Sequence, residues 1–354
     1  MTKLLPTFLD DLLIDHELAA LIGTEADCAA MLRFELALAV AEAEVGLIPH
    51  QAANRIVEAA RTFRPNLDLL RQGALRDGVV APDLIRQLRS HVGEPQSSHM
   101  HMGATSQDVI DTALALKLRP ALEVFESRLN AAISALDRLK ADFGVEFLMG
   151  RTRMQAAIPI TVGQRIAVWQ GLLVRAVQAL VEVRDRNLII SLAGAAGSSD
   201  KLRDAADEIR HRMAASLGLS VPDYVPHSAR DRIAILGGWL SLVTGALGKM
   251  GQDIALMAQN EFGEIGLAGG GGSSAMAHKQ NPVRAEILVT LARFNAVQLS
   301  GLHQSLVHEQ ERSGAAWTLE WMILPQMLNA TGVALLHAGN QMASIARMGS
   351  PSRD

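Results

Sequence analysis

The sequence predicts an all-α protein whose centre is a bundle of five long helices. Aromatic residues make up only 4% of the 354 residues, and the chain has one Tyr, a composition that disfavours β-sandwiches and β-barrels. After residue 105, apolar residues recur at spacings of three and four over long segments, as on the buried face of a helix. No segment alternates between apolar and polar residues for long enough to predict a strand.

Residues 1–104 are expected to form a small N-terminal helical domain. They read as short helices separated by ordinary breakers, which lie at 46–49, 64–66 and 93–96. The single cysteine, Cys28, cannot form an internal disulfide, so we expect a buried small apolar side chain. Pro6 and the acidic residues that follow it argue against a signal peptide, so a cytoplasmic protein is expected.

Residues 105–348 are expected to form the central bundle. Its predicted helices contain apolar stripes or long apolar stretches at roughly 118–136, 166–183, 229–260, 282–312 and 320–346. Pro120 lies inside the first helix and is expected to kink or interrupt it. Residues 349–354 are expected to be a frayed tail.

Charge and hydropathy exclude several functions. The net charge of -4 leaves no sequence-wide positive field for nucleic acid or anionic lipid, so a small anionic ligand would need local cations. Two long uncharged stretches invite a membrane interpretation. Residues 233–248 are short for a span, and residues 321–346 carry Pro, Gln, Asn and His side chains. Both are expected to be helices buried in a bundle or an oligomer.

The most unusual local sequence is the glycine-rich segment 263–282. One interpretation is a flexible linker that ends with Asn281 as N-cap and Pro282 at the first helical position. The other is a lid that places hydroxyl, cation and amide groups over an anionic substrate, using Ser273, Ser274, Lys279 and Asn281. A phosphate-binding P-loop is excluded as a strict match, because Lys279 does not directly follow a glycine.

Two further segments carry candidate functional residues. In 99–113, Thr105 and Asp108 fit a capping box, and His101 has no Cys or carboxylate at zinc-ligand spacing, so no metal site is expected. In 149–161, two arginines and two threonines precede a helix. They are either a solvated turn or a site that binds carboxylates in bidentate fashion.

Together the three segments resemble the signature regions of the fumarase/aspartase superfamily. Residues 272–281 are similar to the superfamily loop pattern G-S-S-x-M-P-x-K-x-N, with Ala277 in place of the proline. The resemblance implies a small N-terminal helical domain and a long five-helix bundle. It also implies a homotetramer with a twenty-helix core and active sites shared between subunits. The small C-terminal helical domain of longer relatives is expected to be absent.

Within the superfamily the chain is most similar to the lactone-forming cycloisomerases. The similarity rests on the runs 101–108, 230–234 and 311–321, although Ala229 replaces a usual glutamine. It implies that a carboxylate of 3-carboxy-cis,cis-muconate adds to a double bond and closes a γ-lactone. This is a step in the protocatechuate branch of the β-ketoadipate pathway and requires no cofactor and no metal.

Two alternatives remain open at this point. One is an adenylosuccinate- or argininosuccinate-type lyase that releases fumarate, but such lyases have histidine where this chain has Arg153. The other is a non-catalytic structural oligomer, since lens crystallins reuse the fold.

The resemblance also assigns roles to individual residues. It implies that Ser273 is the general acid/base, and that Lys279 and Asn281 bind a substrate carboxylate or stabilise the enolate-like intermediate. It also implies that His101 binds substrate or transfers a proton. The residues it implies for binding the substrate are Thr105, Ser106, Arg151, Thr152, Arg153, Ser274, Met276 and Asn281.

Overall fold

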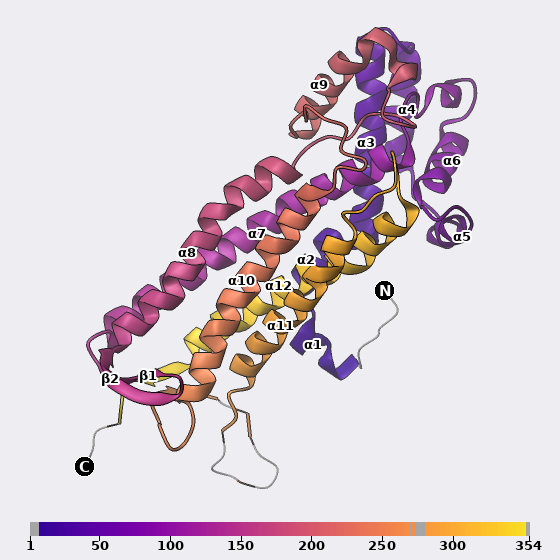
Figure 1. The fold of residues 1–354 in the computed structure, drawn as a ribbon. Helices are drawn as coiled ribbons and strands as arrows, with labels where there is room; N and C mark the ends of the chain where they lie inside the picture. Colours follow the sequence, from indigo (N-terminus) through magenta and orange to yellow (C-terminus); the bar gives the residue numbers. More distant parts are fainter. Residues whose placement is uncertain (1–6, 270, 273–275, 277–279, 352–354) are drawn as a thin grey trace.

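The computed structural model describes residues 7–269, 271–272, 276 and 280–351. Five long helices run side by side along a rod-shaped molecule (Figure 1). They are α7 (Ser106–Phe143), α8 (Val162–Asn187), α10 (Asp231–Met257), α11 (Val283–Gln304) and α12 (Gly314–Ala343). The all-α fold and the five long helices predicted from the sequence are therefore confirmed. Helix α7 continues through Pro120, so the expected interruption does not occur.

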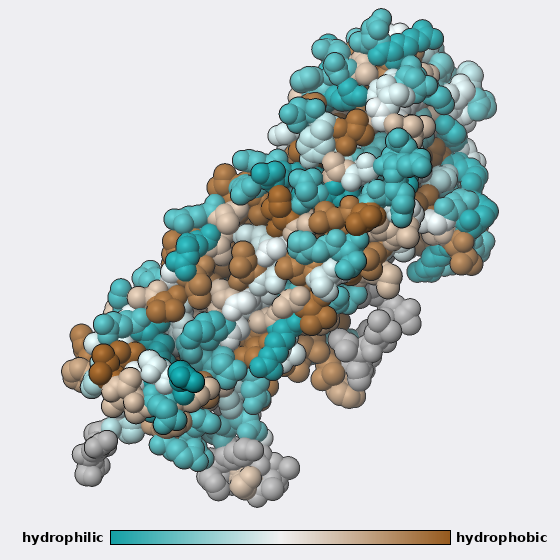
Figure 2. Space-filling view, in the orientation of Figure 1, coloured by the Kyte–Doolittle hydropathy of each residue, from teal (hydrophilic) through white to brown (hydrophobic). Residues whose placement is uncertain are grey.

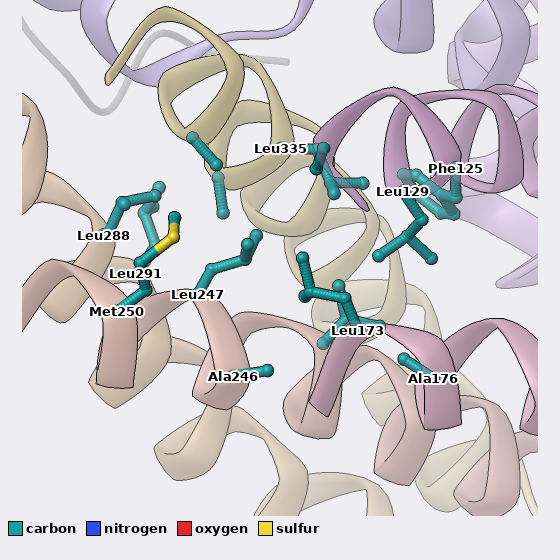
Figure 3. Packing of buried hydrophobic residues seen from close by; sticks show 14 of the residues in the cluster. Phe125, Leu129, Leu173, Ala176, Ala246, Leu247, Met250, Leu288, Leu291 and Leu335 are labelled. Carbon is teal, nitrogen blue, oxygen red and sulfur yellow. The ribbon is translucent and has the colours of Figure 1, made fainter. Parts of the chain in front are cut away.

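The long helices form because their apolar residues face one interior. The predicted stripes are buried: Leu122, Phe125 and Leu129 of α7 have no exposed surface, and Leu173 of α8 is 2% exposed. Figure 3 shows the side chains of Phe125, Leu129 and Leu173 turned toward those of Leu247 on α10 and Leu335 on α12. Burial of this continuous apolar surface, at roughly 25 cal/mol per Å², is the main force that holds the rod together.

Most of the N-terminal helices gather at one end of the rod, whereas the first two lie alongside the five-helix bundle (Figure 1). The N-terminal helices are α1 (Asp10–Leu13), α2 (His16–Ile22), α3 (Thr24–Glu44), α4 (His50–Thr62), α5 (Leu67–Asp77) and α6 (Ala81–Val92). Three of these helices end at the breakers that the sequence predicts. Apolar residues of α3 to α6 form a second core together with α9 (Ala206–Leu217), a helix that the sequence did not predict. Leu18 of α2 instead packs in the core of the bundle. Cys28 is a buried free thiol in the second core, as expected.

Short strands lie at the opposite end of the rod. Strands β1 (Phe147–Thr152) and β2 (Gln155–Thr161) form an antiparallel hairpin, and β3 (Ile265–Leu267) pairs with β4 (Ile345–Met348). The prediction of no strand was therefore wrong. Thr152 pairs with Gln155, so the hairpin turn consists of Arg153 and Met154, whose φ values are 49° and 66°. A two-residue hairpin turn with positive φ usually carries Asn and Gly, and this sequence lacks that signal.

The chain after β4 is tied to strand β1 of the hairpin and to the segment before β3. The amide of Gly349 donates to the carbonyl of Glu264 at 2.9 Å, and the amide of Ser350 donates to the carbonyl of Phe147 at 2.7 Å. The rest of the predicted frayed tail, residues 352–354, lies outside the described residues.

Two helices, α8 and α10, are long and apolar enough to cross a membrane, but core helices of soluble proteins meet the same criterion. The most apolar window of α10 is 61% buried within the chain, whereas that of α8 is only 33% buried. Figure 2 shows apolar residues exposed along the rod among polar ones. Examples on α8 are Val168 and Val181, which are 53% and 61% exposed.

Candidate active site

The first group of predicted site residues lies at the N-terminus of α7. Thr105 is the N-cap, and its amide donates to Asp108 Oδ2 at 3.0 Å in a capping box, which confirms the predicted cap. Ser106 is the first residue of the helix. His101 and Gly103 both have left-handed backbone conformations, with φ of 59° and 72°, so the chain turns sharply just before the helix. Thr105, Ser106 and His101 are thus brought together at one helix end.

A buried carboxylate holds the His101 ring. Glu35 of α3 accepts a hydrogen bond from His101 Nδ1 at 2.7 Å, and the Glu35 side chain is only 2% exposed. Desolvation lowers the pKa of His101, but the charge of Glu35 and this hydrogen bond outweigh it and raise the pKa overall. Glu35 was not predicted from the sequence. The signal was a lone carboxylate inside the apolar run 34–41, which is unusual on a buried helix face.

Asp108 fastens a second segment to the same helix end. Its fully buried carboxylate accepts hydrogen bonds from the amides of Ala193 and Gly194 at 2.9 and 3.0 Å, and from the Ser191 hydroxyl at 3.0 Å. His227 Nε2 lies 2.7 Å from the same carboxylate. Asp108 therefore joins three segments behind Thr105, and its role is structural rather than direct contact with a substrate.

Buried ion pairs fix the neighbouring helices. The Arg230 guanidinium binds Asp111 of α7 at 2.5 Å and Glu320 of α12 at 2.6 and 2.9 Å. Burial acts to lower the pKa of Arg230, but the two carboxylates raise it overall, while Arg230 keeps the pKa of both carboxyls below their usual range. This network anchors the start of α10 at the same end of the rod.

The second group of predicted residues lies on the β1–β2 hairpin, at the other end of α7. Arg151 Nη1 donates to Glu264 Oε1 at 2.7 Å, and its guanidinium lies 4.2 Å from the centre of the Phe262 ring. Thr152 and Arg153 are exposed at the tip of the hairpin. Among the residues that the structure describes, Arg153 makes no hydrogen bond or ion pair. Its guanidinium is therefore available for an anion, whereas that of Arg151 is already engaged.

The glycine-rich segment begins beside this hairpin. Ser273, Ser274, Lys279 and the unusual Ala277 lie outside the described residues, and Met276 is described and 45% exposed. The backbone of Asn281 exchanges hydrogen bonds with Gly271 at 2.8 and 3.0 Å, and α11 begins only at Val283. The prediction that Asn281 caps the helix was therefore wrong, because pairing with Gly271 commits its backbone to a bridge and leaves Pro282 as the N-cap.

Comparisons with known proteins identify the family. A family model described as lyase matches residues 18–297. The chain belongs to this lyase family, within the fumarase/aspartase superfamily. It is 36% identical over 313 residues to the 3-carboxy-cis,cis-muconate cycloisomerase of Acinetobacter baylyi, a match that covers 86% of this chain and 69% of that protein. It is 33% identical over 310 residues to the N-acetyl-S-(2-succino)cysteine lyase of Dickeya dadantii, covering 84% and 68%.

A solved structure of the family has the same fold. The crystal structure of 3-carboxy-cis,cis-muconate lactonizing enzyme from Pseudomonas putida superposes with a TM-score of 0.91 at 34% identity, covering 97% of this chain and 77% of that one. The fumarase/aspartase-like fold inferred from the signature segments is confirmed by this match.

In this lyase-family chain the two groups of site residues lie far apart. Helix α7 separates them, and its 38 residues span about 57 Å at 1.5 Å per residue. A small carboxylate cannot contact both ends of such a helix. Among the described residues, no group of three or more His, Cys, Asp and Glu side chains could hold a metal ion.

Proposed function

We propose that this lyase-family chain is a cytoplasmic cycloisomerase that interconverts 3-carboxy-cis,cis-muconate and 4-carboxymuconolactone in the protocatechuate branch of the β-ketoadipate pathway. The observation that carries the proposal is the 36% identity over 313 residues to a cycloisomerase of that name. The superfamily loop sequence at 272–281 supports it, because the serine, lysine and asparagine of the pattern are all present.

The reaction needs one proton transfer and no change of oxidation state. In the lactone-forming direction, a carboxylate oxygen of the substrate bonds to one carbon of a double bond, and the neighbouring carbon takes up a proton. In reverse, a base removes that proton and the carbon–oxygen bond breaks. We assign Ser273 as this acid and base. A serine alkoxide is a strong base that requires nearby donors, a role that suits Lys279.

Recognition of a tricarboxylate requires several donors. Arg153, exposed and without an ion-pair partner among the described residues, is suited to clamp one carboxylate with two parallel hydrogen bonds. Thr105 and Ser106 present hydroxyl groups at a helix N-terminus, where the helix dipole favours an anion. We assign His101 to substrate binding or proton transfer. The further residues that we assign to substrate binding are Arg151, Thr152, Ser274, Met276 and Asn281.

The separation of the two groups supports a site shared between subunits. We propose a homotetramer in which His101 of one subunit meets Ser273 of another. Exposed apolar side chains on three bundle helices would be buried by such an assembly, namely Val168, Val181, Leu242 and Val297.

The test of the shared site is to mix two inactive variants, His101→Asn and Ser273→Ala, and allow their subunits to exchange. If each site takes these residues from different subunits, about one quarter of wild-type activity returns. Mixtures that exchange subunits but stay inactive would overturn the shared site.

The proposed reaction is tested by ultraviolet absorbance. EDTA-treated protein is mixed with 3-carboxy-cis,cis-muconate, and loss of the conjugated diene is followed as the lactone closes. We expect rapid loss, a drop of at least about a hundredfold in kcat for Ser273→Ala, and a smaller effect for Ser274→Ala as the matched control. Full activity in Ser273→Ala would overturn the assignment of that serine.

One observation favours a second candidate function. The 33% identity to an N-acetyl-S-(2-succino)cysteine lyase is close to that of the cycloisomerases, so a lyase that releases an unsaturated dicarboxylate is the alternative. Assaying fumarate release from N-acetyl-S-(2-succino)cysteine, adenylosuccinate and argininosuccinate separates the two. Release from any of them, with no lactone formed, would replace the cycloisomerase proposal. Inertness toward all substrates would favour a non-catalytic oligomer.

A further inference from the structure

We propose that Glu35 is a positioning residue for His101, which fixes the ring with Nδ1 toward the protein and Nε2 as the nitrogen that meets the substrate. The inference rests on the proposed function only in placing His101 at the site. The orientation of the ring and its basicity are properties of the free protein and can be measured without substrate.

The geometry leaves one ring nitrogen for chemistry. His101 Nδ1 lies 2.7 Å from Glu35 Oε1, and an ionised carboxylate can only accept, so Nδ1 carries the proton in the neutral ring. Nε2 makes no hydrogen bond to any described residue, and the His101 side chain keeps 15% of its surface exposed. The neutral ring therefore presents the Nε2 lone pair as a base or a hydrogen-bond acceptor.

The backbone and the burial indicate more than a packing role. His101 holds a φ of 59°, a conformation that costs a non-glycine residue about 1–2 kcal/mol. Glu35 comes from α3, 66 positions earlier, and its side chain is buried, whereas that of His101 is 15% exposed. A buried pair of this kind contributes little net stability compared with apolar residues of the same size. His101 thus has a strained backbone and contacts the desolvated carboxylate of Glu35. Because neither feature adds much stability, we infer that the pair serves to orient the His101 ring.

Three charged groups set the basicity of the ring. Glu35 raises the pKa of His101, Asp108 of α7 raises it further, and Arg89 of α6 lowers it. Glu42, two turns after Glu35 on α3, is fully buried, and burial together with the charge of Glu35 raises its pKa to about 9. Glu42 is therefore neutral near pH 7 and serves as a matched control, a buried carboxyl on the same helix without a histidine partner.

The experiment compares Glu35→Gln with Glu42→Gln. The pKa of each histidine is read from the pH dependence of hydrogen–deuterium exchange at its imidazole Cε1 carbon, followed peptide by peptide by mass spectrometry. We expect the pKa of His101 to fall by about one unit or more in Glu35→Gln and to stay within about 0.3 units in Glu42→Gln. Glu35→Asp, which keeps the charge but shortens the reach, should give an intermediate value.

Activity provides the second readout. If the cycloisomerase reaction is observed, the acidic limb of its kcat/KM profile should shift to lower pH in Glu35→Gln, by the same number of pH units as the His101 pKa. KM should change less than kcat. An unchanged His101 pKa in folded Glu35→Gln or Glu35→Asp, or an equal shift in Glu42→Gln, would overturn the positioning role. Because the exchange measurement needs no substrate, failure of the proposed reaction would leave this result intact.

Discussion

Arg151 on β1 donates a 2.7 Å hydrogen bond to Glu264, and this contact joins two segments that lie 113 positions apart in the chain. Glu264 is also held by its backbone, since its amide donates to the carbonyl of Met257 and its carbonyl accepts from Gly349. The Arg151–Glu264 pair therefore fixes the hairpin against the base of the glycine-rich segment, where two of the three signature regions meet.

The first prediction concerns this pair. Glu264→Gln should lower the free energy of unfolding by about 2 kcal/mol, because it removes a charge-assisted hydrogen bond from a side chain that is 4% exposed. Urea denaturation measures the change. Glu261→Gln, an exposed carboxylate three positions earlier, is the control and should change stability by less than about 0.5 kcal/mol. Equal effects in the two variants would show that the pair does not anchor the hairpin.

The second prediction concerns Glu42 and pH. Its folded-state pKa of about 9 lies above its ordinary value of 4.5, so the folded chain keeps a proton that the unfolded chain releases. Stability is therefore lost as pH rises between these values, by up to about 1.4 kcal/mol per pH unit. Gln has no such proton to lose. Thermal unfolding should find Glu42→Gln similar to wild type at about pH 5 and more stable at about pH 8. A stability gap that does not grow with pH would show that Glu42 is already ionised in the folded protein.

The five long helices and their buried faces were predictable because the spacing of apolar residues along the chain indicates both. The stripe that contains Leu122, Phe125 and Leu129 has helical periodicity, and each of these side chains is buried on the predicted face. The hairpin was not predictable, because its turn residues, Arg153 and Met154, adopt positive φ although they are not the Asn and Gly that usually indicate such a turn. In that case strand pairing across the turn overrides local preference.

The site was predictable only in part. Motif resemblance pointed to His101 and Thr105, and the structure brings them together at the N-terminus of α7. It could not point to Glu35, because the contact with His101 spans 66 positions and leaves no spacing pattern in the sequence. Nor could the sequence show that Arg151 is engaged by Glu264, since that ion pair exists only once the two segments are folded together.

The third prediction concerns the buried arginine. Arg230→Met leaves the buried carboxylate of Glu320 without its arginine and leaves Asp111 with only the longer 3.4 Å contact to Arg232, so it should cost about 3–5 kcal/mol near neutral pH. The pKa values of both carboxyls are lowered in the folded protein, so the stability they contribute is present above their unfolded pKa and is lost as pH falls. The difference between wild type and Arg230→Met should therefore shrink below about pH 4.

Denaturant unfolding at neutral and acidic pH measures this dependence. Glu320→Gln, which leaves Asp111 paired with the arginine, is the milder control and should destabilise the chain less than Arg230→Met. A deficit in Arg230→Met that is the same at every pH would mean that lost packing, rather than the unpaired carboxylates, accounts for the instability.

The fourth prediction concerns the strained hairpin turn. Met154 has a φ of 66° and is 71% exposed, so its side chain gains little from packing while its Cβ disfavours the left-handed backbone. Met154→Gly removes that Cβ and should raise the free energy of unfolding by about 0.5–1 kcal/mol, because glycine adopts this conformation readily. Met154→Ala keeps the Cβ and should not stabilise the chain, so the two variants compared by urea denaturation separate backbone strain from loss of the thioether. Should glycine give no gain over alanine, the turn is not strained. Should it stabilise the fold but reduce kcat/KM, the rigid turn is needed to present Arg153 to the substrate.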